Sequence, residues 1–153
     1  MNRLILPLFI LLTLPVFALA DNKLSPEQQK IFADASRFRT IHASSNLPPA
    51  VVKLCADGHG RFAEPGRAWN VGDAIIDDTL PASRLIWGAT DGDYYVVHFE
   101  HGGIAHSFLI LIVNTKPDAA KPAVILQAYS VHLLKNYNAF IQAIQAGKLI
   151  SRD

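Results

Sequence analysis

Three residues whose types can cooperate in nucleophilic catalysis lie close together in the chain: His98, Glu100 and Ser107. A serine nucleophile needs an imidazole to take its proton and an acid to orient the other ring nitrogen. If the glycine pair at 102–103 forms a two-residue hairpin turn, His98 and Ser107 lie opposite each other on adjacent strands. Glu100 then lies on the same face. No nucleophile-elbow motif surrounds Ser107, so the residue types of a hydrolytic site are present without its local signature.

Histidines offer a second candidate site, for a metal ion. His101 and His106 flank the same expected turn and would stand diagonal to each other across the hairpin, with His59 and His98 as further imidazoles. Two imidazoles can share a zinc or copper ion, but a tight zinc site takes three or four ligands, and the spacing fixes no third one. The alternative is that these histidines are simply exposed near a turn. We therefore expect no cofactor, with zinc or copper as the alternative.

Cys55 is the only cysteine of the chain, so it cannot form an internal disulfide. Its thiol is then buried, reactive or paired with another molecule. The proline pair at 48–49 predicts the start of a short helix and Gly58 its end, which puts Cys55 near the helix C-terminus. That position disfavours a reactive thiolate. A buried, inert thiol is the favoured interpretation.

Residues 56–82 are the least regular part of the sequence, and loops of this length often carry function. Short strands are expected within it at 61–63 and near 74–76. Arginine and tryptophan are residue types that often anchor protein interfaces. We take four residues as candidate binding residues: His59, Arg61, Arg67 and Trp69. The alternative for Trp69 and the nearby Phe62 is that both close the core beneath the loop.

The candidates between His98 and Ser107 lie in a stretch that predicts three antiparallel strands, residues 84–113. Its apolar runs are rich in β-branched and aromatic residues, and Asp-Gly at 91–92 and Gly-Gly at 102–103 separate them with dipeptides typical of tight hairpin turns. Two-residue turns would give these opposite pairs: Trp87 with Val96, Leu85 with His98, His98 with Ser107, Glu100 with Ala105, and Val96 with Leu109. A slip of one residue would exchange the faces of a strand.

Two helices are expected to pack on this sheet. Ser25–Gln28 has the pattern of a capping box with proline at the first helical position, and an apolar stripe continues to about Ile41. A further strand is predicted at 123–129 and a final helix at 133–146. The predicted fold class is α+β: an antiparallel sheet of about four to five strands, with a central meander at 84–113, packed against an N-terminal and a C-terminal helix.

Residues 1–20 have the pattern of a secretory signal peptide, with one cation at Arg3, an apolar run and a small-x-small end before Asp21. The alternative is an uncleaved membrane anchor. After cleavage, residues 21–153 would form a single α+β domain, periplasmic or secreted, with no stable membrane anchor. Removing Arg3 lowers Lys+Arg from 14 to 13, equal to the 13 Asp+Glu, so nucleic acid is not an expected partner.

No motif in the sequence names a reaction. We expect a small binding protein whose partner is another exported protein or a small ligand, for example an inhibitor or an immunity-like protein. The alternative is a small metal-dependent or hydrolytic enzyme that uses the hairpin histidines and Glu100. The sequence does not decide whether the chain is an enzyme, but it favours a protein without catalytic activity.

Overall fold

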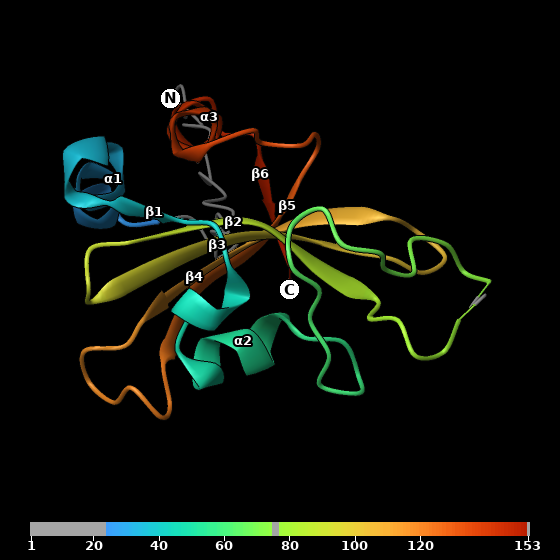
Figure 1. Cartoon of the computed structure of the whole chain (residues 1–153). Coiled ribbons are helices and arrows are strands. Elements are labelled where there is room, and N and C mark those ends of the chain that lie inside the picture. Colours follow the sequence, from blue (N-terminus) through green and yellow to red (C-terminus); the bar gives the residue numbers. More distant parts are fainter. Residues whose placement is uncertain (1–23, 75–76, 153) are drawn as a thin grey trace, which may run out of the picture.

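The computed structural model describes residues 24–74 and 77–152, so the expected signal peptide and part of the strand expected near 74–76 lie outside the described residues. Six strands form one antiparallel sheet in which each strand pairs with the next one along the chain (Figure 1). The elements are α1 (Pro26–Ala33), β1 (Arg39–Ile41), α2 (Pro49–Cys55), β2 (Ser83–Thr90), β3 (Tyr94–His101), β4 (Ser107–Asn114), β5 (Ala123–Ser130), α3 (Tyr137–Gln145) and β6 (Leu149–Ser151). The predicted α+β class with an antiparallel sheet is confirmed, but the sheet has six strands rather than four or five.

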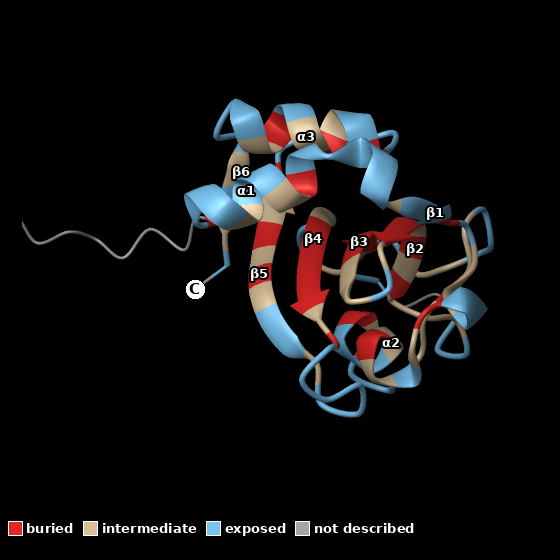
Figure 2. Cartoon of the chain, turned by 90° about the vertical axis from the view of Figure 1, so that its left-hand side faces the viewer, coloured by how far each residue is buried: buried red, intermediate tan, exposed pale blue. Residues whose placement is uncertain are grey.

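Helices lie on both faces of the sheet, α1 and α3 on one and α2 on the other (Figure 1). We call these the α1/α3 face and the α2 face. Five consecutive residues are buried in each of the central strands β3 and β4, so both faces of the sheet contribute to a core (Figure 2). Among the described residues, none of the helices has the length and apolar character needed to span a membrane.

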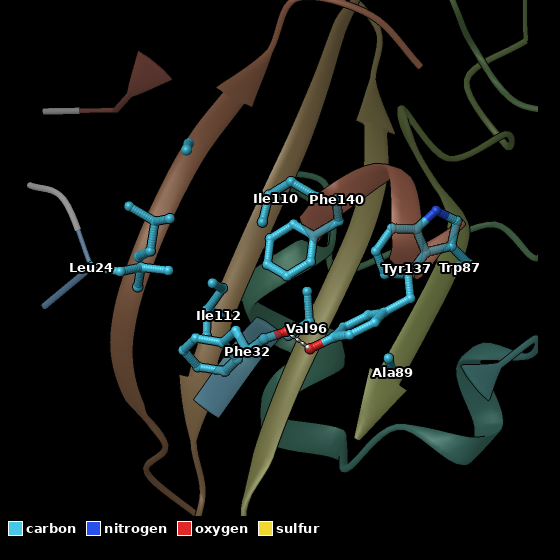
Figure 3. Close-up of a cluster of buried hydrophobic side chains, with 11 residues drawn as sticks. Leu24, Phe32, Trp87, Ala89, Val96, Ile110, Ile112, Tyr137 and Phe140 are labelled. Atoms are coloured by element: carbon cyan, nitrogen blue, oxygen red, sulfur yellow. Dashed lines mark hydrogen bonds between the residues drawn. The ribbon is translucent and has the colours of Figure 1, made fainter. Parts of the chain in front are cut away.

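The α1/α3 face is closed by aromatic side chains. Phe32 of α1 and Phe140 of α3 are fully buried against Val96 and Ile110 of the sheet (Figure 3). The hydroxyl of Tyr137 donates to the backbone oxygen of Phe32 over 3.0 Å, which ties α3 to α1 and satisfies a buried polar group (Figure 3).

The first helix begins as predicted but ends earlier. The side chains and backbones of Ser25 and Gln28 form the reciprocal bonds of a capping box. The helix then stops at Ala33 instead of continuing to Ile41, because the carboxylate of Asp34 accepts from the backbone N–H and hydroxyl of Ser36 and turns the chain. The rest of the predicted helix forms a 3₁₀ turn and β1, so the predicted boundary is wrong.

The final helix is also shorter than predicted, and the reason is a set of tertiary contacts. Residues 133–136 are not helical because Leu134 bonds to the sheet: its N–H donates to His98 Nε2 over 3.1 Å, and its oxygen accepts from Trp87 Nε1 over 2.7 Å. Asn136 then caps α3, its side chain accepting from the N–H of Ala139. The strand predicted at 123–129 is confirmed as β5, whereas β6 was not predicted.

The first hairpin turn is longer than predicted. Thr90 pairs with Tyr95, and the Asp91 carboxylate accepts from two backbone N–H groups of the turn, while Gly92 takes a positive φ of 103°. A β-bulge between Leu85 and Trp87 adds a second change, so Trp87 lies opposite His98 and Leu85 opposite Phe99. The predicted pairs of Trp87 with Val96 and of Leu85 with His98 are wrong.

The second hairpin departs further, because His101 pairs with Ser107 and the connection runs from 102 to 106. Its glycine pair serves a close approach instead of a tight turn: a Cβ atom on Gly102 would lie 2.0 Å from the backbone oxygen of Asn70. The register differs from the predicted one by three residues, an odd number, so the faces of β4 are exchanged. The predicted opposite pairs of His98 with Ser107, Glu100 with Ala105, and Val96 with Leu109 are all wrong.

The α2 face has its own core, into which Val51 and Cys55 project from the predicted short helix. Beyond α2, the described parts of the loop, residues 56–74 and 77–82, lie at one end of the sheet (Figure 1). The strand expected at 61–63 reduces to one parallel bridge, between Ala63 and Arg84. It holds the loop against the outer side of β2.

Candidate binding surface at the loop and the hairpin tip

The bulged register brings Arg84 and Glu100 together at the end of the sheet. They are direct partners across β2 and β3, and the Arg84 Nε and Nη2 atoms lie 2.7 and 2.6 Å from Glu100 Oε1. Nη1 of Arg84 donates to the backbone oxygen of Arg67, 3.1 Å away. The Glu100 side chain is only 7% exposed, so its charge needs such a partner.

Trp69 and His106 complete this group, which we call the tip network: Trp69, Arg84, Glu100 and His106. The His106 Nε2–H donates to Glu100 Oε2 over 2.8 Å, so both carboxylate oxygens are engaged. The Trp69 ring packs on the Arg84 guanidinium, 5.0 Å from its centroid, and against the His106 ring at 5.4 Å. Polar and aromatic contacts together therefore fix the position of Trp69.

Two large apolar side chains project from the backbone beside this network. Ile104 is 96% exposed and Val71 is 50% exposed. Their segments are bonded to each other, because Gly103 N–H donates to the Val71 oxygen over 3.3 Å, and Gly102 N–H donates to the Ala82 oxygen over 2.9 Å. We call the resulting area the loop–tip surface: Arg67, Trp69, Val71, Ile104 and His106.

The other two predicted binding residues, His59 and Arg61, lie elsewhere, at a turn built on the buried carboxylate of Asp57. Its Oδ1 accepts from the N–H groups of His59 and Arg61, and its Oδ2 from that of Ala82, each over 2.9 Å. Burial alone would raise the pKa of Asp57, but these hydrogen bonds and the Arg61 charge outweigh it and hold the pKa below its usual value. Asp57 thus fastens the two ends of the long loop together.

A cavity of about 360 Å³ opens beside this turn. His59, Arg61 and His101 line it together with the carboxylates of Asp73 and Asp78. The Arg61 guanidinium is already engaged, because it pairs with the Asp57 carboxylate and donates to the Asp78 backbone oxygen. The four predicted binding residues therefore divide into two pairs, one at this cavity and one on the loop–tip surface, and Ile104 of the loop–tip surface also lines the cavity.

His98 is fully buried, and both of its ring nitrogens have backbone partners. Nδ1–H donates to the Leu109 oxygen over 2.9 Å, and Nε2 accepts from the N–H of Leu134. Burial lowers the pKa of His98 to about 4, so the ring is neutral at pH 7. Its contacts are those of a histidine that links the sheet to the segment before α3.

The structure does not bring the three candidate catalytic residues together. Ile110, not Ser107, is the partner of His98, and the Ser107 hydroxyl donates to the Ala105 backbone oxygen. Glu100 bonds to Arg84 and His106 instead of orienting His98.

The two candidate metal ligands lie on opposite faces of the sheet. His106 bonds to Glu100 on the α1/α3 face, whereas His101 bonds to the Ser83 hydroxyl and lines the cavity on the α2 face. Within residues 24–74 and 77–152, no three His, Cys, Asp or Glu side chains group in a way that could hold a metal ion. Cys55 is only 1% exposed, and burial raises the pKa of its thiol, so the predicted buried position is confirmed.

Comparison of the chain with protein-family models, curated proteins and solved structures finds no match. The functional argument therefore depends on the residues themselves. Arg84 and Asp57 are the residues that sequence reasoning missed as organisers of the site. Asp57 had a readable signal, since an aspartate directly before Gly58 favours a side-chain-bonded turn. Arg84 had none, because its pairing with Glu100 depends on a bulge that the sequence does not mark.

Proposed function

We propose that this chain is a binding protein that recognises another protein through the loop–tip surface. The observation that carries the proposal is the state of Ile104, whose side chain is 96% exposed on a tip that is itself fixed in position. Single exposed apolar residues are common on protein surfaces. Here, however, the segment that carries Ile104 is hydrogen-bonded to the backbone of half-exposed Val71, two residues along the chain from the ordered ring of Trp69. We treat these three side chains as one small apolar patch with an aromatic anchor.

The tip is pre-organised, which favours binding. Backbone bonds join Gly102 and Gly103 to the loop, and Gly102 leaves no room for a Cβ atom next to Asn70. A surface already ordered in the free protein loses less conformational entropy when a partner binds. Exposed Arg67 borders the patch, whereas the charge of Arg84 is neutralised by Glu100. Ile104 also lines the cavity that contains Asp57, Asp73 and Asp78. We therefore expect a partner that presents an apolar pocket to Ile104 and a carboxylate to Arg67.

The proposed setting is outside the inner membrane, because the first 20 residues have the pattern of a secretory signal. A partner in the periplasm or in the medium fits that pattern, and an inhibitor or immunity-like protein is one form that such an interaction takes. The enzyme alternative, with hairpin histidines and Glu100, has less support. His98 is buried with both nitrogens bonded, and His101 and His106 face opposite ways.

Site-specific photocrosslinking in the organism that encodes the chain tests this proposal. A photoreactive phenylalanine analogue is placed at Ile104 and, as the matched control, at Ile150, which is 58% exposed on the edge strand β6. We expect one defined crosslinked product at position 104 that is absent at position 150. The trapped protein is then identified and its affinity for the purified chain measured.

Two variants make the test quantitative. Ile104→Asp should weaken binding of the identified partner at least tenfold while leaving the melting temperature unchanged, because the side chain makes almost no contacts in the free protein. Ile150→Asp should leave affinity unchanged. Identical crosslinking at both positions, or full affinity of Ile104→Asp, would rule out the loop–tip surface as the binding site.

A further inference from the structure

A second, smaller cavity lies on the α2 face, where the C-terminal end of α2 meets strands β3, β4 and β5. Its volume is about 190 Å³. Phe99 and Leu109 line its apolar part together with Cys55, and all three are at most 3% exposed. His101, Gln127 and Arg152 bring polar groups to the same cavity. It therefore combines an apolar floor with a polar rim, which is the usual make-up of a small-molecule site.

The imidazole of His101 is held in place at this rim. Its Nδ1 lies 2.8 Å from the hydroxyl of Ser83, a residue with no exposed surface. Because Ser83 occupies Nδ1, Nε2 is the ring nitrogen that a ligand can reach. A buried hydroxyl that fixes one imidazole nitrogen orients the other.

The guanidinium of Arg152 is also positioned. It stacks over the Tyr129 ring at 5.9 Å from the centroid, and Tyr129 itself lines the cavity. The backbone N–H of Arg152 donates to the Gln127 oxygen over 2.8 Å, so the residue is tied to β5. A planar guanidinium held on an aromatic ring presents its remaining N–H groups in a geometry that matches a carboxylate.

The charge of the lining indicates the class of ligand. No acidic side chain is among the described residues that line this cavity, whereas one arginine and one histidine are. The larger cavity beside His59 differs, because Asp57, Asp73 and Asp78 line it and would repel an anion. The smaller cavity is thus suited to an anionic group, and its apolar floor to a hydrocarbon portion.

We propose that this cavity binds a small monocarboxylate, with the carboxylate at Arg152 and His101 and a short apolar tail against Phe99 and Leu109. The cavity is smaller than the roughly 300–1,000 Å³ of sites for drug-sized ligands, so the ligand is a short-chain or single-ring acid. The site lies on the opposite face of β3 from the tip network, and it does not depend on the loop–tip surface binding a protein.

Calorimetric and NMR titrations with butyrate and benzoate test this proposal, and the neutral amides butyramide and benzamide serve as matched ligands. Both acids should bind saturably and the amides about tenfold more weakly, since the amides lack the charge that Arg152 recognises. Backbone shifts should be confined to the end of α2 and to the residues around His101 and Gln127.

Two arginine variants locate the binding. Arg152→Gln should weaken both acids about tenfold, and Arg39→Gln, a change at an exposed arginine of β1, should have no effect. Both positions are exposed, so both variants are expected to fold, and circular dichroism checks this. Absence of saturable binding, equal affinity for acids and amides, or unchanged binding by Arg152→Gln would each overturn the proposal.

Discussion

Lowering the pH should destabilise this protein through one residue, His98. The ring has no exposed surface, and its Nε2 accepts a hydrogen bond from the N–H of Leu134. Protonation would put a charge into the core and turn Nε2 into a donor that faces another donor. The protein therefore resists protonation, and burial lowers the pKa of His98 from 6.5 to about 4.

The sign and size of the effect follow from linkage. Because the pKa is lower in the folded state, the unfolded chain binds the proton more readily between about pH 4 and 6.5, and stability falls as the pH falls through that window. The pKa differs by about 2.5 between the two states, and each pH unit of difference corresponds to about 1.4 kcal/mol, so the total loss of unfolding free energy is about 3–4 kcal/mol. Most of this loss, about 2–3 kcal/mol, should occur between about pH 7.5 and about pH 4.5.

Urea unfolding across that pH range measures the effect, with His98→Gln as the test and His132→Gln as the control, since His132 is exposed. His98→Gln should be less stable at neutral pH but should lose about 2–3 kcal/mol less than the natural chain on acidification, because glutamine does not titrate. The control should follow the natural chain. If the natural chain and His98→Gln lose the same free energy on acidification, the burial argument for His98 is refuted.

Three further perturbations test the contacts around the loop. Gly102→Ala should lower the free energy of unfolding, measured in urea, by about 1–3 kcal/mol, because its Cβ would lie 2.0 Å from the backbone oxygen of Asn70. Gly72→Ala, in the loop that Gly102 contacts, should lower it less. Asp57→Asn should lower the free energy of unfolding by about 2–3 kcal/mol, because an amide nitrogen would face a backbone N–H. It should also increase hydrogen exchange at Arg61 and Ala82, and unchanged exchange there would contradict the role of Asp57 in holding the loop ends together. Cys55 should react with iodoacetamide only as fast as the protein opens, so a rate that urea does not increase would contradict its burial.

Several local signals in the sequence predict the type of element correctly. The capping box at Ser25, the proline-initiated helix at 49–55 and the strand at 123–130 each depend on neighbouring residues alone. Boundaries failed where a tertiary contact competed with the local pattern. Leu134 is an example, since its backbone bonds to Trp87 and His98 prevent the helix from starting there.

The sequence predicts only part of the candidate site, because local patterns identify residue types but not the tertiary contacts that position them. The residue types of Arg67 and Trp69 predict a binding role, and both residues lie on the loop–tip surface. The contacts that hold Trp69 cannot be predicted from its neighbours in the chain, because its ring packs on Arg84, which is distant in sequence. Arg152 gave no signal at all: its place at the smaller cavity depends on β6, a strand of three residues.

The role of Gly102 explains why the predicted catalytic group does not form. A two-residue turn at 102–103 would have placed Ser107 opposite His98. The loop instead crosses so close to Gly102 that only glycine fits there, and the connection extends to five residues, 102–106. The resulting odd shift turns Phe108 toward His98 and puts Ser107 on the opposite face. One close backbone contact thus leaves His98 enclosed by aromatic and aliphatic side chains, where it stays neutral and structural.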